Sequence, residues 1–159
     1  MDEMQKKHER GVGDDFIKWY NIKHSTAFVY HDRGTDPPDL IYRDGDQEML
    51  LEITASYYEP EQAKMYWQNA RGVADAPSMY MLQNPDQNLI EDINTRLAKK
   101  CDKPYPINCT LVLQIYPDLI SAGELDVLLE EIQIPSGHSF KSIYLAGIFT
   151  NGYQCWKLA

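Results

Sequence analysis

The chain has 159 residues, of which 43% are hydrophobic and 25% are charged. That length matches one ordinary domain able to bury a core. Its formal net charge is −9, from 24 acidic and 15 basic residues. This balance argues against a general nucleic-acid binder, which normally presents a basic face. It leaves a local basic groove open, and acidic clusters are what hard cations require.

The sequence also bears on the compartment. Residues 1–10 are charged throughout and no apolar segment follows them, so we expect no secretory signal peptide. No apolar run is long enough to cross a bilayer. Three cysteines without CxxC spacing predict buried or half-buried thiols and neither a disulfide framework nor a zinc site. We therefore expect a cytoplasmic protein without a membrane partner.

The first half of the chain predicts a helix followed by three strands. Residues 1–24 form the expected helix, because Val12, Phe16 and Tyr20 repeat every four residues as a buried stripe. Two glycines weaken this helix by about 1 kcal/mol each. Strands are then predicted at 26–31, 39–43 and 48–54, with a loop at 32–38.

The second half predicts helices alternating with strands. Its expected elements are helices at 59–71, 86–101 and 121–132, a loop at 72–85, and strands at 109–116, 141–149 and 153–158. The run at 109–116 is apolar throughout and predicts a buried central strand. Together these elements predict one α/β domain spanning residues 1–159, with a mixed central sheet flanked by helices.

The hairpin at 39–54 carries the main chemical signal. A loop at 44–47 would place Asp39 directly opposite Glu52, and a loop shorter by one or two residues would slip that register. The register is favoured because it puts the hydrophobic side chains of both strands on one face. Asp39, Glu52 and Thr54 then share the other face.

Two opposed carboxylates on one face need a neutralising group. Directly opposed residues have Cβ atoms about 5 Å apart, and like charges at that distance repel. A divalent metal removes the repulsion, and Mg²⁺ is commonly held by one or two carboxylates with waters and phosphate oxygens. The alternative is that both side chains are solvated, with Asp39 only shaping the turn after Pro38.

Pro38-Asp39, an intervening hairpin and then Glu52-Ile53-Thr54 resemble the motif of the PD-(D/E)XK nuclease superfamily. The flanking elements are similar too: an upstream helix bearing a glutamate, and a downstream helix followed by a buried strand. The resemblance spans residues 1–116 in architecture, but its specific motif is a few residues long. It implies a restriction-endonuclease-like fold and endonuclease activity that depends on Mg²⁺ or Mn²⁺.

The resemblance also implies roles for individual residues. Asp39, Glu52 and the main-chain carbonyl of Ile53 would hold the metal, and Glu9 on the first helix would assist through water. Glu9 lies three residues before Val12, close to the buried stripe of that helix. The alternative for Glu9 is an ordinary residue at the edge of a highly charged face.

Thr54 departs from the family pattern, because the family carries lysine at this position. That lysine is thought to position or activate the attacking water and to stabilise charge at the phosphate. Some members carry it on a neighbouring helix instead, and Lys100 is the candidate here. In a helix it lies about 20° from Leu89 and Ile93, within the apolar stripe. Such a lysine either extends out to solvent at the helix end or meets carboxylates.

Two functions follow. The first is a hydrolase: a metal-dependent nuclease that cuts phosphodiester bonds of nucleic acid, with DNA favoured over RNA. The second is a catalytically inactive nuclease-like module acting in protein interaction or defence-associated scaffolding, favoured by Thr54 and the net charge. Placement of the Lys100 amine within about 4–6 Å of Glu52 would favour the enzyme. A homodimer through the final hairpin, 144–156, which we expect to be exposed, is a further expectation.

Overall fold

A computed structural model describes residues 2–57, 68–72, 85–117 and 119–159. The elements within these ranges are α1 (Glu3–His24), β1 (Val29–Arg33), β2 (Leu40–Asp44), β3 (Gln47–Ser56), α3 (Pro85–Cys101), β4 (Cys109–Ile115), α4 (Ala122–Leu128), a 3-10 turn (Leu129–Glu131), β5 (Ser142–Phe149) and β6 (Gly152–Lys157).

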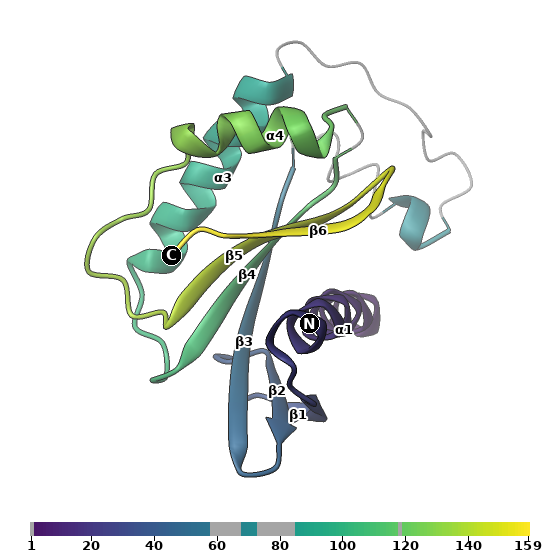
Figure 1. Cartoon of the computed structure of the whole chain (residues 1–159), viewed down its shortest axis with the longest axis vertical. Coiled ribbons are helices and arrows are strands. Elements are labelled where there is room, and N and C mark those ends of the chain that lie inside the picture. The colour runs from purple at the N-terminus through teal and green to yellow at the C-terminus, as the bar shows by residue number, and fades with distance from the viewer. Residues whose placement is uncertain (1, 58–67, 73–84, 118) are drawn as a thin grey trace.

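The six strands form one sheet in chain order (Figure 1). Strands β1, β2 and β3 are antiparallel, β3, β4 and β5 are parallel, and β6 returns antiparallel to β5. Helix α1 lies on one face of this sheet, and helices α3 and α4 lie on the other. The predicted α/β class, with a mixed central sheet flanked by helices, is therefore confirmed.

Alternation along the central strands divides the core into two layers. Leu51 and Ile53 of β3 pack in the cluster that includes α1, whereas Leu111 and Leu113 of β4 pack against α3 and α4. Because successive side chains of a strand point to opposite faces, Glu52 is directed to the α3 face. The alternation therefore decides which helix a polar side chain on β3 can meet.

The hairpin between β2 and β3 has the predicted register. Arg43 pairs with Glu48 and Leu40 with Leu51, which continues to Asp39 opposite Glu52. The turn is tighter than predicted, because Asp44 and Gln47 join the ladder and only Gly45 and Asp46 remain between the strands. Gly45 has a φ of +59°, which the absence of a side chain makes easy. Residue parity is unchanged, so the faces are as predicted.

Helix α1 approaches β2 very closely at Gly13. A Cβ atom at this position would lie 2.4 Å from Leu40 Cδ1 and 2.7 Å from Tyr42 Oη. Glycine therefore sets the distance between helix and sheet. The helix begins at a capping box in which Asp2 accepts from the Gln5 amide and Gln5 reaches back to the Asp2 amide.

Two predicted element boundaries and one predicted exposure differ clearly from the structure. The first strand begins at Val29 rather than residue 26, because Asn21 Oδ1 holds the preceding segment through the Phe28 amide at 2.9 Å. The helix predicted at 121–132 ends at Leu128 and continues only as a 3-10 turn. The final hairpin is not exposed as a whole, since β5 is mostly buried between β4 and β6.

Some predictions lie largely outside the described residues. The helix predicted at 59–71 is described only from residue 68, where residues 68–70 are helical. The loop predicted at 72–85 is described only at its two ends, and Pro85 is the first residue of α3. Within the described ranges, none of the helices combines the length and apolar composition needed to cross a membrane. All three cysteines are free thiols, as predicted.

Candidate metal centre

Asp39 sits immediately before β2 and continues its contacts with β3 beyond the Leu40–Leu51 pair. Its amide donates to the Leu51 carbonyl at 3.0 Å, and its Oδ2 accepts from the Ile53 amide at 2.8 Å. The side chain is 5% exposed. Two main-chain contacts thus fix the position of a buried carboxylate next to the middle of β3.

Glu52 lies in the middle of β3 and is 4% exposed. Its Oε2 accepts from Lys100 Nζ at 2.9 Å. Its Oε1 is buried and has no hydrogen-bond partner among the described residues. Because an unpaired buried carboxylate oxygen is costly, this atom marks a position where a further ligand would lower the free energy.

Lys100 reaches Glu52 from the last turn of α3. Leu97 and Ile93 are fully buried one and two turns earlier, respectively, which directs Lys100 towards the sheet. Burial lowers the pKa of Lys100, but the hydrogen bond and charge of Glu52 outweigh burial and raise it overall. The amine is therefore a firmly protonated donor. The Tyr105 ring lies beside it, with its centroid 5.9 Å from Nζ.

Asp36 joins the two predicted carboxylates. Oxygen atoms of Asp36, Asp39 and Glu52 all lie within 4.8 Å of one another. Asp36 belongs to an exposed loop that folds back on itself, with its amide donating to the Pro38 carbonyl at 3.1 Å. The sequence offered no periodicity there, so Asp36 was not among the predicted residues.

The neighbouring negative charges affect the pKa of Asp39. Burial raises the pKa of Asp39 to about 8, and the Glu52 and Glu9 carboxylates push it in the same direction. The hydrogen bond from the Ile53 amide opposes these effects without cancelling them. A cation at this position would remove both the repulsion and the desolvation cost.

Glu9 reaches the same region from α1. It forms an ion pair with Arg33, with 2.7 Å between Glu9 Oε2 and Arg33 Nη2, and its side chain is 17% exposed. Its charge is close enough to contribute to the raised pKa of Asp39. The structure thus places Glu9 near the carboxylates, paired with a cation that the sequence analysis did not single out.

Ile53 and Thr54 line the edge of β3 beside this cluster. The amide and carbonyl of one strand residue lie on the same edge, and the Ile53 amide points to Asp39. Its carbonyl therefore points towards the same edge, which β2 pairs only as far as Leu51. Thr54 is half-buried and follows directly.

A cavity of about 360 Å³ lies along this strand edge; Glu9 lines it, whereas Asp36, Asp39, Glu52 and Lys100 are not among its described lining residues. Residues from α1, β3 and α3 line it: Gln5, His8, Glu9, Ile53, Thr54, Ala55 and Arg96. The His8 ring contacts the Tyr116 hydroxyl, and burial lowers the pKa of His8, so that it is neutral at physiological pH. Arg96 Nε lies 3.5 Å from Asp92, which also binds the Ser56 hydroxyl.

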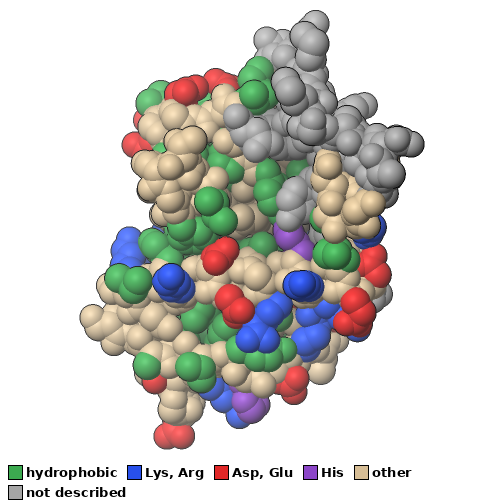
Figure 2. Space-filling view, turned by 90° about the vertical axis from the view of Figure 1, so that its right-hand side faces the viewer, with side chains coloured by type: hydrophobic (Ala, Val, Ile, Leu, Met, Phe, Trp, Pro, Cys, Tyr) green, Lys and Arg blue, Asp and Glu red, His purple; other side chains and the backbone are tan. Residues whose placement is uncertain are grey.

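Charge on the molecular surface is mixed where Figure 2 shows it. On the face shown in Figure 2, Lys and Arg side chains lie between Asp and Glu side chains. Among the described residues of that face they form no continuous basic surface. A ligand with several phosphates would therefore find a few separate cations rather than a broad positive groove.

Similarity to other proteins was sought at three levels. Comparisons with protein-family models, with curated proteins and with solved structures each gave no match. The interpretation of the site therefore depends on its own atoms: three clustered carboxylates, one protonated lysine and an adjoining cavity.

Proposed function

We propose that the chain is a divalent-metal-dependent nuclease that hydrolyses phosphodiester bonds of nucleic acid, with DNA favoured over RNA. In this proposal it is a member of the PD-(D/E)XK superfamily with a restriction-endonuclease-like fold, and its ion is Mg²⁺ or Mn²⁺. The observation that carries the proposal is the 2.9 Å contact of Lys100 Nζ with Glu52 beside Asp39. In this proposal Lys100 on α3 replaces the lysine that the family carries on the strand, at the position that Thr54 occupies here.

The donor atoms at the site suit a hard cation. Carboxylates of Asp36, Asp39 and Glu52 and the carbonyl of Ile53 are all oxygen donors, which Mg²⁺ and Mn²⁺ prefer. The buried Oε1 of Glu52, which has no hydrogen-bond partner within the described part of the chain, supports occupation of this position. When bound, the ion would lower the pKa of a water molecule and offset charge on the scissile phosphate.

The chain's own groups would divide the remaining tasks. Lys100, held protonated by Glu52, would orient the attacking water or neutralise charge that develops on the phosphate. Arg96 lines the cavity with only its Nε directed at Asp92 among the described contacts, so its terminal nitrogens are available to a phosphate. Glu9 would act through water, and the Thr54 hydroxyl would contact the substrate in the cavity.

The first experiment is a calorimetric titration with Mg²⁺ and with Mn²⁺. We expect binding by the unchanged protein and none by the double variant Asp39→Ala with Glu52→Ala. Circular dichroism checks that the double variant is folded. Failure of the folded, unchanged protein to bind either ion, alone or with a single-stranded oligonucleotide present, would refute the metal centre.

The second experiment separates metal binding from catalysis. Lys100→Met is expected to keep metal binding and to lose cleavage of a labelled DNA oligonucleotide by a factor on the order of 100 or more. Lys99→Met is the matched control, because Lys99 lies one residue away and is exposed. Equal cleavage by the two variants would exclude the proposed role of Lys100.

A nuclease-like module without catalytic activity is the second candidate. It is favoured by Thr54 at the lysine position and by the pairing of Arg33 and Arg96 with acidic side chains. It predicts that the folded protein leaves single- and double-stranded DNA and RNA intact with either ion. Metal binding without any cleavage would therefore favour this module over the enzyme.

A further inference from the structure

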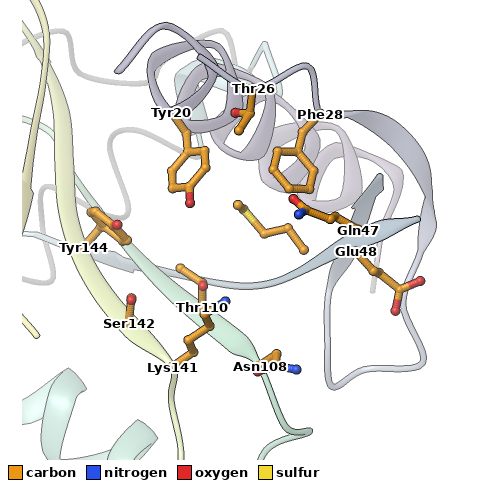
Figure 3. Close-up of a pocket in the computed structure, with 11 residues that line it drawn as sticks. Tyr20, Thr26, Phe28, Gln47, Glu48, Asn108, Thr110, Lys141, Ser142 and Tyr144 are labelled. Carbon is orange, nitrogen blue, oxygen red and sulfur yellow. The ribbon is translucent and has the colours of Figure 1, made fainter. Parts of the chain in front are cut away.

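A second cavity, of about 350 Å³, lies at the other end of the α1 face of the sheet. It is formed where α1 ends and where β3, β4 and β5 begin (Figure 3). Its volume falls within the range of roughly 300–1,000 Å³ typical of small-molecule sites. The cavity lies apart from the proposed metal centre, because Thr110 on its floor faces α1 while Glu52 faces α3.

Aromatic and apolar side chains form one part of the cavity wall. Tyr20 and Phe28 point into it from the α1 side, and Tyr144 closes it from β5 (Figure 3). Met49 contributes a buried apolar surface from β3. Flat apolar walls of this kind favour a ligand with a planar ring, which can stack on or against the aromatic side chains.

Hydroxyl and amide groups fill the rest of the wall. They belong to Thr26, Gln47, Asn108, Thr110 and Ser142. Together with Glu48 and Lys141 they make the cavity wall more polar than apolar, so a ligand there would be held by several hydrogen bonds as well as by contacts with the rings. They would hydrogen-bond the polar edge of a ring or a sugar.

The charge balance of the cavity favours an anion. Among its described lining residues, Lys141 is the one cation and Glu48 the one carboxylate. Glu48 is already paired with Arg43 at 2.9 Å, and Figure 3 shows its carboxylate directed away from the cavity. Lys141 is exposed and takes part in none of the ion pairs found among the described residues, and its side chain runs towards Thr110. One uncompensated positive charge thus borders an aromatic cavity in a protein of net charge −9.

We infer that this cavity is a binding site for a small anion bearing a planar ring, of about the size of a nucleoside monophosphate. The ring lies against Tyr20, Phe28 and Tyr144, and the anionic group meets the Lys141 ammonium. The Thr110 and Ser142 hydroxyls lie between them and bind the polar centre of the ligand. The inference stands independently of the proposed nuclease function, because it uses none of the same side chains.

The test uses two probes of this class, adenosine 5′-monophosphate and indole-3-acetate, titrated into the full chain in EDTA. EDTA removes divalent ions and so prevents recruitment of phosphate to the carboxylates. We expect binding of at least one probe, with amide shifts in ¹H–¹⁵N spectra centred on Thr110 and Ser142. Adenosine, which lacks the anionic group, should bind weaker by a factor on the order of ten.

Variants link binding to the cavity. Lys141→Gln should weaken binding of the successful probe by a factor on the order of ten, whereas Lys99→Gln, an exposed lysine on α3, should not change it. Ser142→Phe should fill the cavity and abolish binding. Absence of binding by both probes, equal affinity of the two lysine variants, or shifts centred on Glu52 would each overturn the inference.

Discussion

Protonation of Asp39 links the stability of the metal-free protein to pH. Between its ordinary pKa of 3.8 and its raised value of about 8, the folded protein holds a proton that the unfolded chain lacks. Stability therefore falls as pH rises through this interval and levels off above it. With respect to this group, the metal-free protein is therefore least stable above about pH 8.

Asp39→Asn should therefore stabilise the metal-free protein. Asparagine can still accept from the Ile53 amide but carries no charge next to Glu52 and Glu9. We expect a gain of about 2 kcal/mol at pH 8, or about 5 °C in melting temperature, shrinking towards zero near pH 4. Thermal melts of both proteins in EDTA across this pH range measure it. The prediction would be contradicted if the stability gained by the variant over the unchanged chain were smaller at pH 8 than at pH 4.

Removing the Lys100 amine should have the opposite effect on stability. Lys100→Met leaves the Glu52 carboxylate buried without a counter-charge, and we expect a loss of about 2 kcal/mol in urea unfolding. Glu52→Gln in the Lys100→Met background should restore most of that loss, because the buried charge is then gone. Lys99→Met should change stability by less than about 0.5 kcal/mol. Equal losses for the two lysine variants would show that the ion pair contributes nothing.

How far the site was predictable depends on the kind of contact. Alternation along β3 and the angular position of Lys100 on α3 are local properties, so the sequence predicted that Glu52 and Lys100 could meet. Asp36 lies in a loop and Arg33 at the end of a strand, and both reach the site through backbone geometry that leaves no periodic pattern in the sequence. Asp92, which binds Ser56, Tyr57 and Arg96 together, depends on tertiary packing of α3 and could not have been singled out.

At the scale of elements, α1 provides a matched pair of glycines. Gly13→Ala places a Cβ atom against Leu40 and Tyr42 and should destabilise the protein by about 1–2 kcal/mol, despite the better helix propensity of alanine. Gly11 lies in the same helix with nothing within 4 Å of its Cβ position. Gly11→Ala should therefore stabilise by about 0.5–1 kcal/mol.

Urea unfolding of the two alanine variants distinguishes them by sign. The comparison controls for helix propensity, because both substitutions are the same and lie two residues apart in α1. Stabilisation by both would mean that α1 does not need its close approach to β2. Destabilisation by both would mean that alanine acts on α1 through something other than local packing.

Element types were more predictable than their ends and their neighbours. Apolar runs and turn residues identified the strands, and α4 begins at Ser121, whose hydroxyl accepts from the Glu124 amide at 3.1 Å. The start of β1 was missed, because the side chain of Asn21 rather than strand propensity holds the segment before it. The neighbours of β4 in the sheet follow from crossovers, which local patterns do not encode.

At the scale of the whole molecule, net charge limits how nucleic acid can be held. The chain carries −9, and most cations near the site already have acidic partners. We therefore expect few phosphate contacts, about two, and a weak dependence on salt. For a single-stranded oligonucleotide, the slope of log affinity against log salt should be about −1.4.

Fluorescence anisotropy with a labelled oligonucleotide, with Ca²⁺ present to permit binding without rapid cleavage, measures that slope. Arg96→Gln should reduce the magnitude of the slope by about 0.7, which is the contribution of one phosphate contact on a single strand. A slope steeper than about −4 would mean that a broad basic surface exists which the mixed charges in Figure 2 do not suggest.

The two-residue turn at Gly45 and Asp46 has a consequence for how the gene can vary. One strand, β3, presents Glu52 to α3 and Leu51 to α1, so every residue added or removed in the turn inverts both assignments unless the ladder bulges. Single-codon insertions there should be lost from a selected library, whereas two-codon insertions should persist. Whether an insertion in this turn is tolerated would then depend on whether it adds an odd or an even number of residues, rather than on how many it adds.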